Sequence, residues 1–441
     1  MKMNRRDFIK VGAGAFFVST ANRVWGAGAA SNRVRLAIMG CHERGRGKSV
    51  LKTMLKTPGV EIAWVCDVDA RARDYAAKLV EDETGFRPKR EKDVRKVLED
   101  NELDGIICET PDHWHAWAAF MAMNAGKAVY VEKPCCFCPA EGEKLIAEWK
   151  RTGMVFQMGN QRRASKPYQA ALRWAGEGKP LGELKYARAW YDATRPRNGI
   201  GKAVAVPDWL DWDLWQGPAP RTEFHDNYVH YKWHWFRRWG TAESGNNAPH
   251  FLDVARWALG VGFPRRIVSG GGLCFPHPED EYEWPDTFNM TFEYPGEKVI
   301  TWEGTSHLKL NKFMGFGTGA VVYGSEGSLL FAPNDTAAAF APDGSLIRKW
   351  EGTKTADGSL TDPTQGIDPL HSANFVECIR RHDQRTNSPA DEAVKSTFMP
   401  ILGNVAQLSG EAIRLDSETG RLLTKAGEAY WSREYEKGWE F

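Results

Sequence analysis

The hydrophobic and polar positions of the chain change their pattern about a third of the way along. Up to residue 151, short apolar runs alternate with longer stretches of helical periodicity. The apolar runs cover 33–39, 60–66, 103–109 and 128–132, and the helical stretches start at Lys48 and cover 70–83, 113–124 and 140–151. Strand and helix in alternation are typical of βαβ units. We therefore expect an α/β domain with a doubly wound parallel sheet over residues 31–155.

Residues 156–441 have a different pattern. Strand-like stretches at 184–191, 266–275, 287–294, 298–306, 320–323, 328–332 and 346–350 are separated by turn pairs such as Pro295-Gly296. Helical periodicity covers 249–259, 371–381 and 399–413. Strands joined by short turns indicate antiparallel pairing. The pattern predicts an α+β domain with a mostly antiparallel sheet and helices on one of its faces.

Composition excludes some functions. The 58 Lys and Arg nearly cancel the 57 Asp and Glu, so no overall field attracts nucleic acid or an anionic membrane. The C-C-F-C cluster at 135–138 lacks the spacers of a zinc site, and we expect the eight cysteines to be packed or reduced thiols. We expect no bound metal. Small neutral substrates fit this balance best.

Residues 1–30 have the layout of an export signal: a basic head, an apolar Gly/Ala-rich stretch and small residues at the exit. Arg5-Arg6 followed by Asp7-Phe8-Ile9-Lys10 resembles the twin-arginine class, which exports folded proteins. We therefore expect a periplasmic protein. The alternative is a basic amphipathic N-terminus that arose by chance. No later run is long and apolar enough to cross a membrane.

The sequence G-C-H-E-R-G, residues 40–45, follows the first apolar run and precedes a helix. Gly40 suits the tight turn and Gly45 the close approach of helix and strand in a dinucleotide-binding motif. Asp67 ends the next apolar run, where an acid bonds the adenosine ribose and repels a 2′-phosphate, so NAD is favoured over NADP. His42 occupies the usual place of a second glycine. The alternative is a turn that has lost its nucleotide.

Two further motifs carry a family resemblance. Thr110-Pro111-Asp112-His113-Trp114-His115 and Glu132-Lys133-Pro134 both follow apolar runs at the ligand-binding edge of a parallel sheet. Together with the glycine turn, which includes Arg44, they resemble the glucose-fructose oxidoreductase, inositol dehydrogenase and rhizopine-catabolism (Gfo/Idh/MocA) family. The resemblance implies an NAD-binding Rossmann domain, an open-faced sheet domain and a homo-oligomer, either dimer or tetramer.

The resemblance also assigns roles to the first domain. It implies that Thr110, Pro111, His115 and Glu132 line the cofactor and that Pro134 follows a cis peptide bond. It implies that Lys133 reaches the substrate hydroxyl beside the nicotinamide C4, where an ammonium group helps remove the hydroxyl proton. The alternative for Lys133 is a solvated loop charge.

The second half of the expected site is E-S-G-N-N-A-P-H-F-L-D, residues 243–253. In the family an Asp and a His in this motif face the substrate. Here His250 matches and is the candidate general acid/base, and Asp253 is expected to anchor it. Asn246 stands where the family often has Asp, so it can orient a hydroxyl but cannot accept a proton. The alternative for His250 is a structural role at the start of a helix.

Residues 205–240 contain six tryptophans with Asp, His, Arg and Asn between them. Indole faces stack on sugar rings, so this segment is a candidate substrate wall, with most of its rings packed into the protein. We expect Arg163, Tyr191, Trp235, Asn246 and His250 to contact substrate. The family resemblance places Arg163 where the chain turns from cofactor to substrate, so contact with the cofactor is the alternative for this residue.

The predicted function is an exported NAD-dependent oxidoreductase that moves hydride between a hydroxyl carbon of a sugar, sugar alcohol or glycoside and a tightly held cofactor. One alternative is an NAD-dependent glycoside hydrolase that oxidises the ring, eliminates the aglycone and reduces the ring again. Another is a non-catalytic sugar-binding scaffold.

Overall fold

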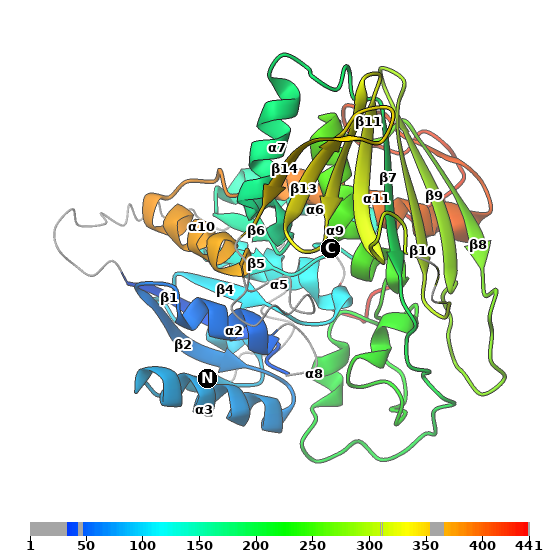
Figure 1. The fold of residues 1–441 in the computed structure, drawn as a ribbon. Coiled ribbons are helices and arrows are strands. Elements are labelled where there is room, and N and C mark those ends of the chain that lie inside the picture. Colours follow the sequence, from blue (N-terminus) through cyan, green and yellow to red (C-terminus); the bar gives the residue numbers. More distant parts are fainter. Residues whose placement is uncertain (1–32, 43–46, 309, 311, 353–365, 440–441) are drawn as a thin grey trace.

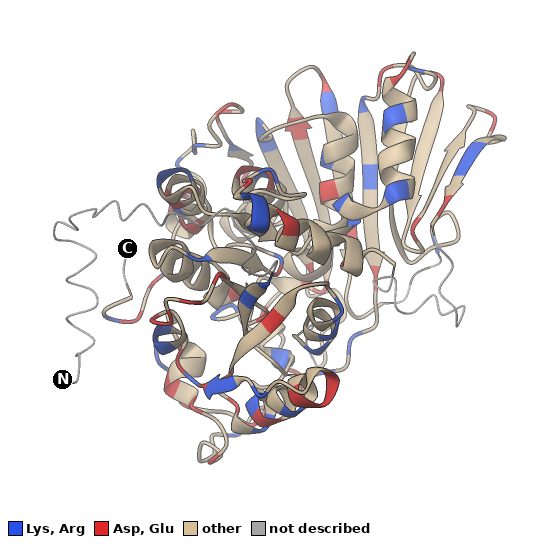
Figure 2. Cartoon of the chain, turned by 90° about the vertical axis from the view of Figure 1, so that its left-hand side faces the viewer, with Lys and Arg blue, Asp and Glu red and all other residues tan. Residues whose placement is uncertain are grey.

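The computed structural model describes residues 33–42, 47–308, 310, 312–352 and 366–439. The expected export signal, residues 1–30, lies outside them. Two sheets dominate the described chain, one in each half of Figure 1. In Figure 2, basic and acidic positions are interspersed, as the near-zero net charge predicts.

The first sheet is wholly parallel in the described residues, with the strand order β3-β2-β1-β4-β5-β6. Its strands are β1 Val34–Met39, β2 Val60–Cys66, β3 Lys89–Glu91, β4 Gly105–Cys108, β5 Ala128–Val131 and β6 Phe156–Met158. Every residue of β4, β5 and β6 is buried, as expected for strands covered on both faces. The predicted doubly wound domain is confirmed.

Helices α2 Gly47–Leu55, α3 Ala70–Thr84, α4 Val94–Val97, α5 Asp112–Asn124 and α6 Pro139–Thr152 connect these strands. The sheet continues through β6, three residues beyond the expected boundary at 155. A late helix, α10 Asp368–Arg381, also returns to this domain. Its Phe375, Val376 and Ile379 share a buried cluster with Leu36 and Ile38 of β1. The first core is therefore completed by a segment distant in sequence.

The second sheet has the order β14-β13-β12-β11-β7-β10-β9-β8-β15. Its strands are β7 Tyr186–Asp192, β8 Arg266–Gly272, β9 Thr287–Tyr294, β10 Lys298–Thr305, β11 Thr318–Gly324, β12 Gly327–Ala332, β13 Thr336–Phe340, β14 Leu346–Glu351 and β15 Ile413–Arg414. Neighbours are antiparallel, except that β7 and β10 are parallel. The mostly antiparallel sheet is confirmed.

Helices α7 Lys166–Gly176, α9 Ala242–Leu259 and α11 Ala390–Ser409 pack against this sheet. Both long helices begin earlier than predicted. Proline favours the first turn of a helix, but Pro249 and Pro400 lie inside α9 and α11. The predicted helix 399–413 also ends early. Gly410 has φ +68° and stops it, and Ile413 and Arg414 pair with β8 instead.

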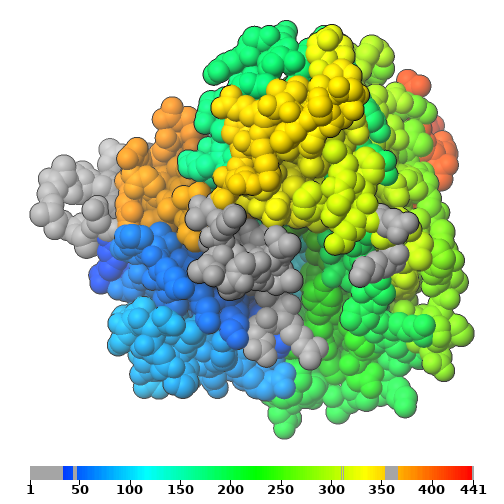
Figure 3. All heavy atoms as spheres, in the orientation of Figure 1, coloured from blue at the N-terminus to red at the C-terminus, as the bar shows by residue number. Residues whose placement is uncertain are grey.

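The aromatic segment, defined here as residues 205–240, joins the two domains. It contains α8 Trp212–Gln216 and the 3₁₀ helix η2 Lys232–Trp235. Its rings form their own core, which includes Trp212, Trp215 and Trp239. The backbone amide of Ala70 donates to the Trp209 carbonyl at 2.8 Å, and Asp211 donates to Val68 at 3.1 Å. In Figure 3 this green segment adjoins the blue N-terminal domain.

All eight cysteines are free thiols, and seven of them are buried. Burial raises the pKa of Cys108 and Cys138 to about 12, so these groups stay protonated and inert. The prediction of packed thiols is confirmed for the cluster at 135–138, whereas Cys274 is exposed. Among the described helices, no span has the length and hydropathy needed to cross a bilayer.

Candidate functional site

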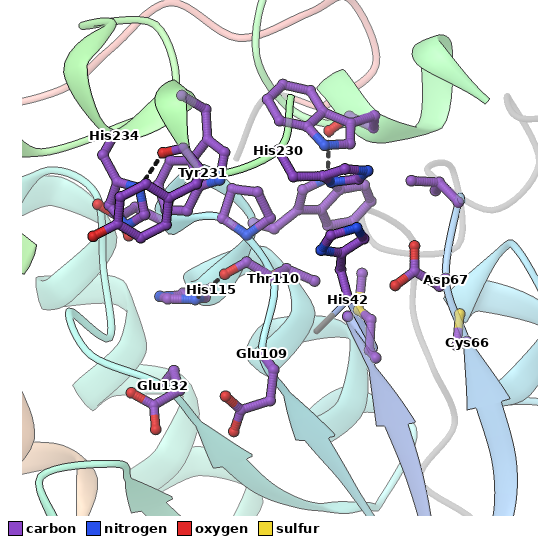
Figure 4. A pocket seen from close by; sticks show the side chains of 18 of the residues that line it. His42, Cys66, Asp67, Glu109, Thr110, His115, Glu132, His230, Tyr231 and His234 are labelled. Atoms are coloured by element: carbon purple, nitrogen blue, oxygen red, sulfur yellow. Dashed lines mark hydrogen bonds between the residues drawn. The ribbon is translucent and has the colours of Figure 1, made fainter. Parts of the chain in front are cut away.

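A cavity of 370 Å³ lies at the carboxyl ends of β1, β2, β4 and β5 and reaches α9 and the aromatic segment. It includes most of the predicted site residues. Its lining includes Gly40, His42, Asp67, Glu109, Thr110, Pro111, His115, Glu132, Lys133, His230, Tyr231, Trp233, His234, Asn246 and His250 (Figure 4). Ligands in parallel α/β sheets bind at this edge.

The described part of the glycine turn, residues 40–42, has the tight backbone that the sequence predicts at Gly40. Gly40 has φ +86°, and a Cβ there would lie 2.7 Å from the Glu109 carbonyl carbon. Arg44 and Gly45 lie outside the described residues. The close approach of helix and strand, expected at Gly45, is observed at Gly47, where a Cβ would lie 2.3 Å from the Gly40 oxygen. The turn thus keeps its backbone close-packed and free of side chains at these two positions.

His42, in the middle slot, does not point away from the cavity. Its ring stacks on His230 of the aromatic segment, with centroids 3.7 Å apart and planes at 17°. His230 in turn hydrogen-bonds through Nε2 to Asp69 at 2.9 Å. His42, Asp69 and His230 are near enough to suggest a metal site. However, two stacked rings cannot both direct an in-plane nitrogen lone pair at one ion.

Asp67 lies at the end of β2, as predicted. Its Oδ2 accepts from the Cys41 amide at 2.6 Å, and its Oδ1 accepts from the Asp69 amide at 2.8 Å. Burial raises the pKa of Asp67, and these two amides oppose that shift. The carboxylate is therefore held rigidly at one end of the cavity, with lone pairs left to accept from a ligand hydroxyl.

His115 holds two corners of the site together. Its Nε2 lies 2.7 Å from the Thr110 carbonyl oxygen and its Nδ1 lies 2.7 Å from that of Pro134. The Lys133–Pro134 peptide bond is cis, as expected. Both ring nitrogens of His115 are thus occupied by backbone. The residue lies on the cavity wall but acts through the Thr110 and Lys133 corners that it positions.

Lys133 and Asn246 meet across the domain boundary. Lys133 Nζ donates to the Asn246 carbonyl at 2.7 Å and to its Oδ1 at 3.3 Å. Lys133 is therefore not a solvated loop charge. His250 lies one turn further along α9 and also lines the cavity. The structure brings together the three residues predicted to be catalytic.

A buried ion pair supports the same end of the cavity. Arg195 binds Glu243 through two contacts, of 2.8 and 2.9 Å, and Glu243 is fully buried. Arg195 also donates to the hydroxyls of Tyr191 and Tyr231 at 2.9 Å. Tyr231 lines the cavity and Tyr191 does not. The predicted substrate contact at Tyr191 is corrected: the residue supports Arg195 from behind the wall.

Two more predicted substrate contacts lie elsewhere. Arg163 is buried in an ion pair with Asp253, with nitrogen–oxygen distances of 2.8 to 3.0 Å. Trp235 is 1% exposed and stacks on Tyr282. Neither lines the cavity, and Asp253, the expected anchor of His250, forms an ion pair with Arg163. Local sequence can place a side chain near a site without showing which way it points. Here the buried Asp253 carboxylate orients Arg163, and the Tyr282 ring orients Trp235.

The sequence predicts the aromatic segment as a candidate substrate wall but does not single out His230, Tyr231, Trp233 and His234, which line the cavity from one short stretch. His234 is 9% exposed, and its Nδ1 lies 2.5 Å from the Tyr231 carbonyl oxygen. Burial lowers the pKa of His234 to about 3. The available signal was the alternation of rings and polar residues in H-Y-K-W-H-W, residues 230–235.

Comparisons with known proteins agree with this geometry. Residues 34–160 match the family model described as an oxidoreductase family with an NAD-binding Rossmann fold, GFO_IDH_MocA. A glycosyl hydrolase family 109 protein of Stenotrophomonas maltophilia is 29% identical over 195 residues, 43% of this chain and 42% of that protein. The scyllo-inositol 2-dehydrogenase (NAD(+)) of Bacillus subtilis is 32% identical over 156 residues, 34% of this chain and 43% of that enzyme. The chain thus spans less than half the length of either relative.

Solved structures extend the likeness to both domains. The aldose-aldose oxidoreductase from Caulobacter crescentus, complexed with glycerol, superposes with a TM-score of 0.65 at 15% identity, covering 87% of this chain and all of that one. At this identity the likeness shows the fold alone. Residues 34–160 therefore match the GFO_IDH_MocA oxidoreductase family, and the two-domain fold is the one seen in the aldose-aldose oxidoreductase.

Proposed function

We propose that the protein is an NAD-dependent oxidoreductase that moves hydride between a nicotinamide and a hydroxyl carbon of a sugar, sugar alcohol or glycoside. One observation carries the proposal. The cavity that contains Gly40 and Asp67 also contains Lys133, held by Asn246 across the domain boundary. A nucleotide-binding edge and a proton-handling group thus share one space. The inositol dehydrogenase and aldose oxidoreductase named above support the substrate class.

The residues present fit NAD. Gly40 and Gly47 leave backbone where a Cβ would collide, and α2 begins beside them, where the first amides of a helix suit a phosphate. Asp67 would accept from a ribose hydroxyl and repel a 2′-phosphate. Thr110, Pro111 and Glu132 would line the nicotinamide half. When bound, the cofactor supplies the hydride acceptor and donor, which protein side chains lack.

Lys133 supplies the electrostatics of the reaction. Asn246 presents only oxygen acceptors to Nζ, so the lysine is held as a donor. An ammonium group at this position stabilises negative charge on a substrate oxygen as its proton leaves. Asn246 cannot accept that proton, so another group must take it.

Export is a further part of the proposal. Residues 1–30 have a twin-arginine layout, and a periplasmic enzyme has no free nucleotide pool. The protein would keep its cofactor through turnover. The aromatic segment favours this retention because its backbone hydrogen-bonds to Val68 and Ala70, which follow β2 beside the nucleotide end of the cavity. Assembly as a homo-oligomer, either dimer or tetramer, belongs to the same proposal.

The relatives in glycosyl hydrolase family 109 favour one alternative. In it, the same site oxidises a glycoside, eliminates the aglycone, adds water and returns the hydride. The oxidoreductase and hydrolase hypotheses use the same site residues. They differ in products, because the hydrolase releases a free sugar and consumes no second redox partner.

The test starts with the purified full-length protein, denatured to release any nucleotide for mass spectrometry. We expect stoichiometric NAD or NADH. The native protein is then mixed with single sugars, polyols and glycosides, with and without an aldose as acceptor, and nicotinamide absorbance and products are followed. Oxidised product supports the oxidoreductase, and free aglycone without net redox change supports the hydrolase. Protein without nucleotide that also fails to bind added NAD would contradict both and favour a sugar-binding scaffold.

A further inference from the structure

His234 lies at the substrate end of the cavity on η2. It is nine-tenths buried, yet it lines the cavity together with Lys133 and Asn246. Its ring stacks on Trp233, with centroids 3.6 Å apart and planes at 18°, which fixes the plane in which its nitrogens point. Figure 4 shows His234 beside Tyr231, on the side of the cavity where His115 and Glu132 lie. The position is rigid and faces the expected substrate.

The contacts of His234 define its tautomer. Nδ1 lies 2.5 Å from the Tyr231 carbonyl oxygen, and a carbonyl only accepts, so Nδ1 carries the hydrogen. In the neutral ring Nε2 therefore has a lone pair. Within the described part of the chain, no hydrogen bond to Nε2 is formed. The structure thus offers a proton acceptor of fixed direction inside the cavity.

The surroundings keep this ring neutral. Lys133 faces it from the β5–α6 connection, Arg195 from the segment after β7, and His115 from α5. The Tyr231 carbonyl is the opposing influence from its own segment. Burial, aided by these basic groups, lowers the pKa of His234 to about 3. The lone pair on Nε2 is therefore available at any working pH of an ordinary enzyme.

We propose that Nε2 of His234, in place of the candidate acid/base His250, accepts the proton of the substrate hydroxyl, the role that Asn246 cannot fill. The inference rests on the proposed function. The substrate C–H bond breaks, and its electron pair goes as hydride to C4 of bound NAD⁺. The O–H bond also breaks, its electron pair becomes the second C–O bond, and the proton goes to Nε2.

Charge is balanced within the cavity during this step. The imidazole would gain the one positive charge that bound NAD⁺ would give up on reduction. The loss of a positive charge from the cavity would offset the weak basicity of His234 during proton transfer. Lys133 donates to the substrate oxygen throughout and keeps its proton. In the reverse reaction, the imidazolium returns the proton to the new alkoxide.

The experiment uses the full-length protein with its bound nucleotide and compares His234→Gln with His277→Gln, a histidine that does not line the cavity. Glutamine accepts a hydrogen bond but takes no proton. We expect kcat for the best sugar to fall about 10²- to 10³-fold in His234→Gln, with KM changed by less than about threefold. His277→Gln should match the wild type. Added imidazole should restore part of the rate to His234→Ala.

A second measurement does not depend on activity. In ¹⁵N-labelled protein, NMR should show one buried neutral imidazole with hydrogen on Nδ1 that stays neutral from pH 8 to below pH 5 and disappears in His234→Gln. NAD content should be equal in all variants. Wild-type kcat in His234→Gln, or hydrogen on Nε2, overturns the inference while NAD-dependent turnover by the wild type leaves the proposed function intact. Wild-type protein without nucleotide or sugar oxidation overturns the proposed function itself.

Discussion

The two walls of the cavity are built in different ways. The first wall comes from the Rossmann domain, where Gly40, Asp67 and Lys133 each follow a buried parallel strand. The second comes from α9 and the aromatic segment, where Asn246 and His234 are placed by packing between distant segments. Strand ends fix the first wall locally. In the second wall, the direction of each side chain depends on the rings and charged groups that neighbouring segments pack against it.

The largest effect should come from the point where the walls meet. Lys133→Met removes the ammonium that donates to two oxygens of Asn246. We expect kcat/KM to fall about 10³-fold, about 4 kcal/mol of transition-state stabilisation, with NAD content unchanged. Steady-state kinetics with the best sugar measure this. Lys78→Met, at an exposed pair with Asp82, is the matched control. Full turnover by Lys133→Met would show that the first wall carries no chemistry.

Arg163 sharpens the comparison because it lies behind the second wall. Arg163→Met leaves Asp253 buried beside Ser396 without its main countercharge. We expect the free energy of unfolding to fall by about 3–4 kcal/mol, with kcat of the folded enzyme within twofold of the wild type. Urea unfolding and kinetics measure the two quantities. Arg90→Met, at an exposed pair with Asp74, should cost less than about 1 kcal/mol. A loss of kcat with stability retained would mean that Arg163 acts on substrate.

These two residues show what sequence could and could not provide. The place of Lys133 is predictable because its triplet follows an apolar run, and the end of a parallel strand dictates where the next residues lie. Its role at the substrate hydroxyl is what the family resemblance implies. Arg163 was placed near the substrate by its position along the chain, but Asp253, ninety residues later, turned it into the core. His234 was missed because nothing in W-H-W shows which member faces a cavity. Both sheets and most helices were predicted, because periodicity reports local burial directly.

The titration of two buried histidines, His234 of the second wall and His113 of α5, provides a third test. His234 has a lowered pKa of about 3, and the pKa of His113 is also lowered by burial. The pKa of histidine in the unfolded chain is about 6.5. Below that pH the two rings bind protons in the unfolded chain but stay neutral in the native protein. Stability is therefore complete above about pH 6.5 and falls as pH decreases. Each ring contributes a slope of about 1.4 kcal/mol per pH unit.

His234→Gln should remove one of these slopes between pH 6 and 4.5, which urea unfolding at several pH values measures. Glu392, whose pKa is lowered to about 2, loses its contribution only as pH falls below the usual carboxyl range. It is common to both proteins and cancels in the comparison. An unchanged slope in His234→Gln would mean that the ring titrates normally in the native state, contrary to the buried neutral imidazole described above.

The smallest effect should come from the salt bridge that joins the walls at the nucleotide end. Lys92 Nζ lies 2.7 Å from Asp211 Oδ2, but the lysine side chain is 52% exposed. A double-mutant cycle with Lys92→Met and Asp211→Asn, read as the rate of NAD release on dilution, should give a coupling of about 0.2–1 kcal/mol that weakens with salt. The backbone bonds at Ala70 and Val68, and Arg71 lying 3.4 Å from the Trp209 ring centre, remain in both variants. A coupling above about 2 kcal/mol would mean that charge, instead of backbone pairing and aromatic packing, holds the second wall against the first.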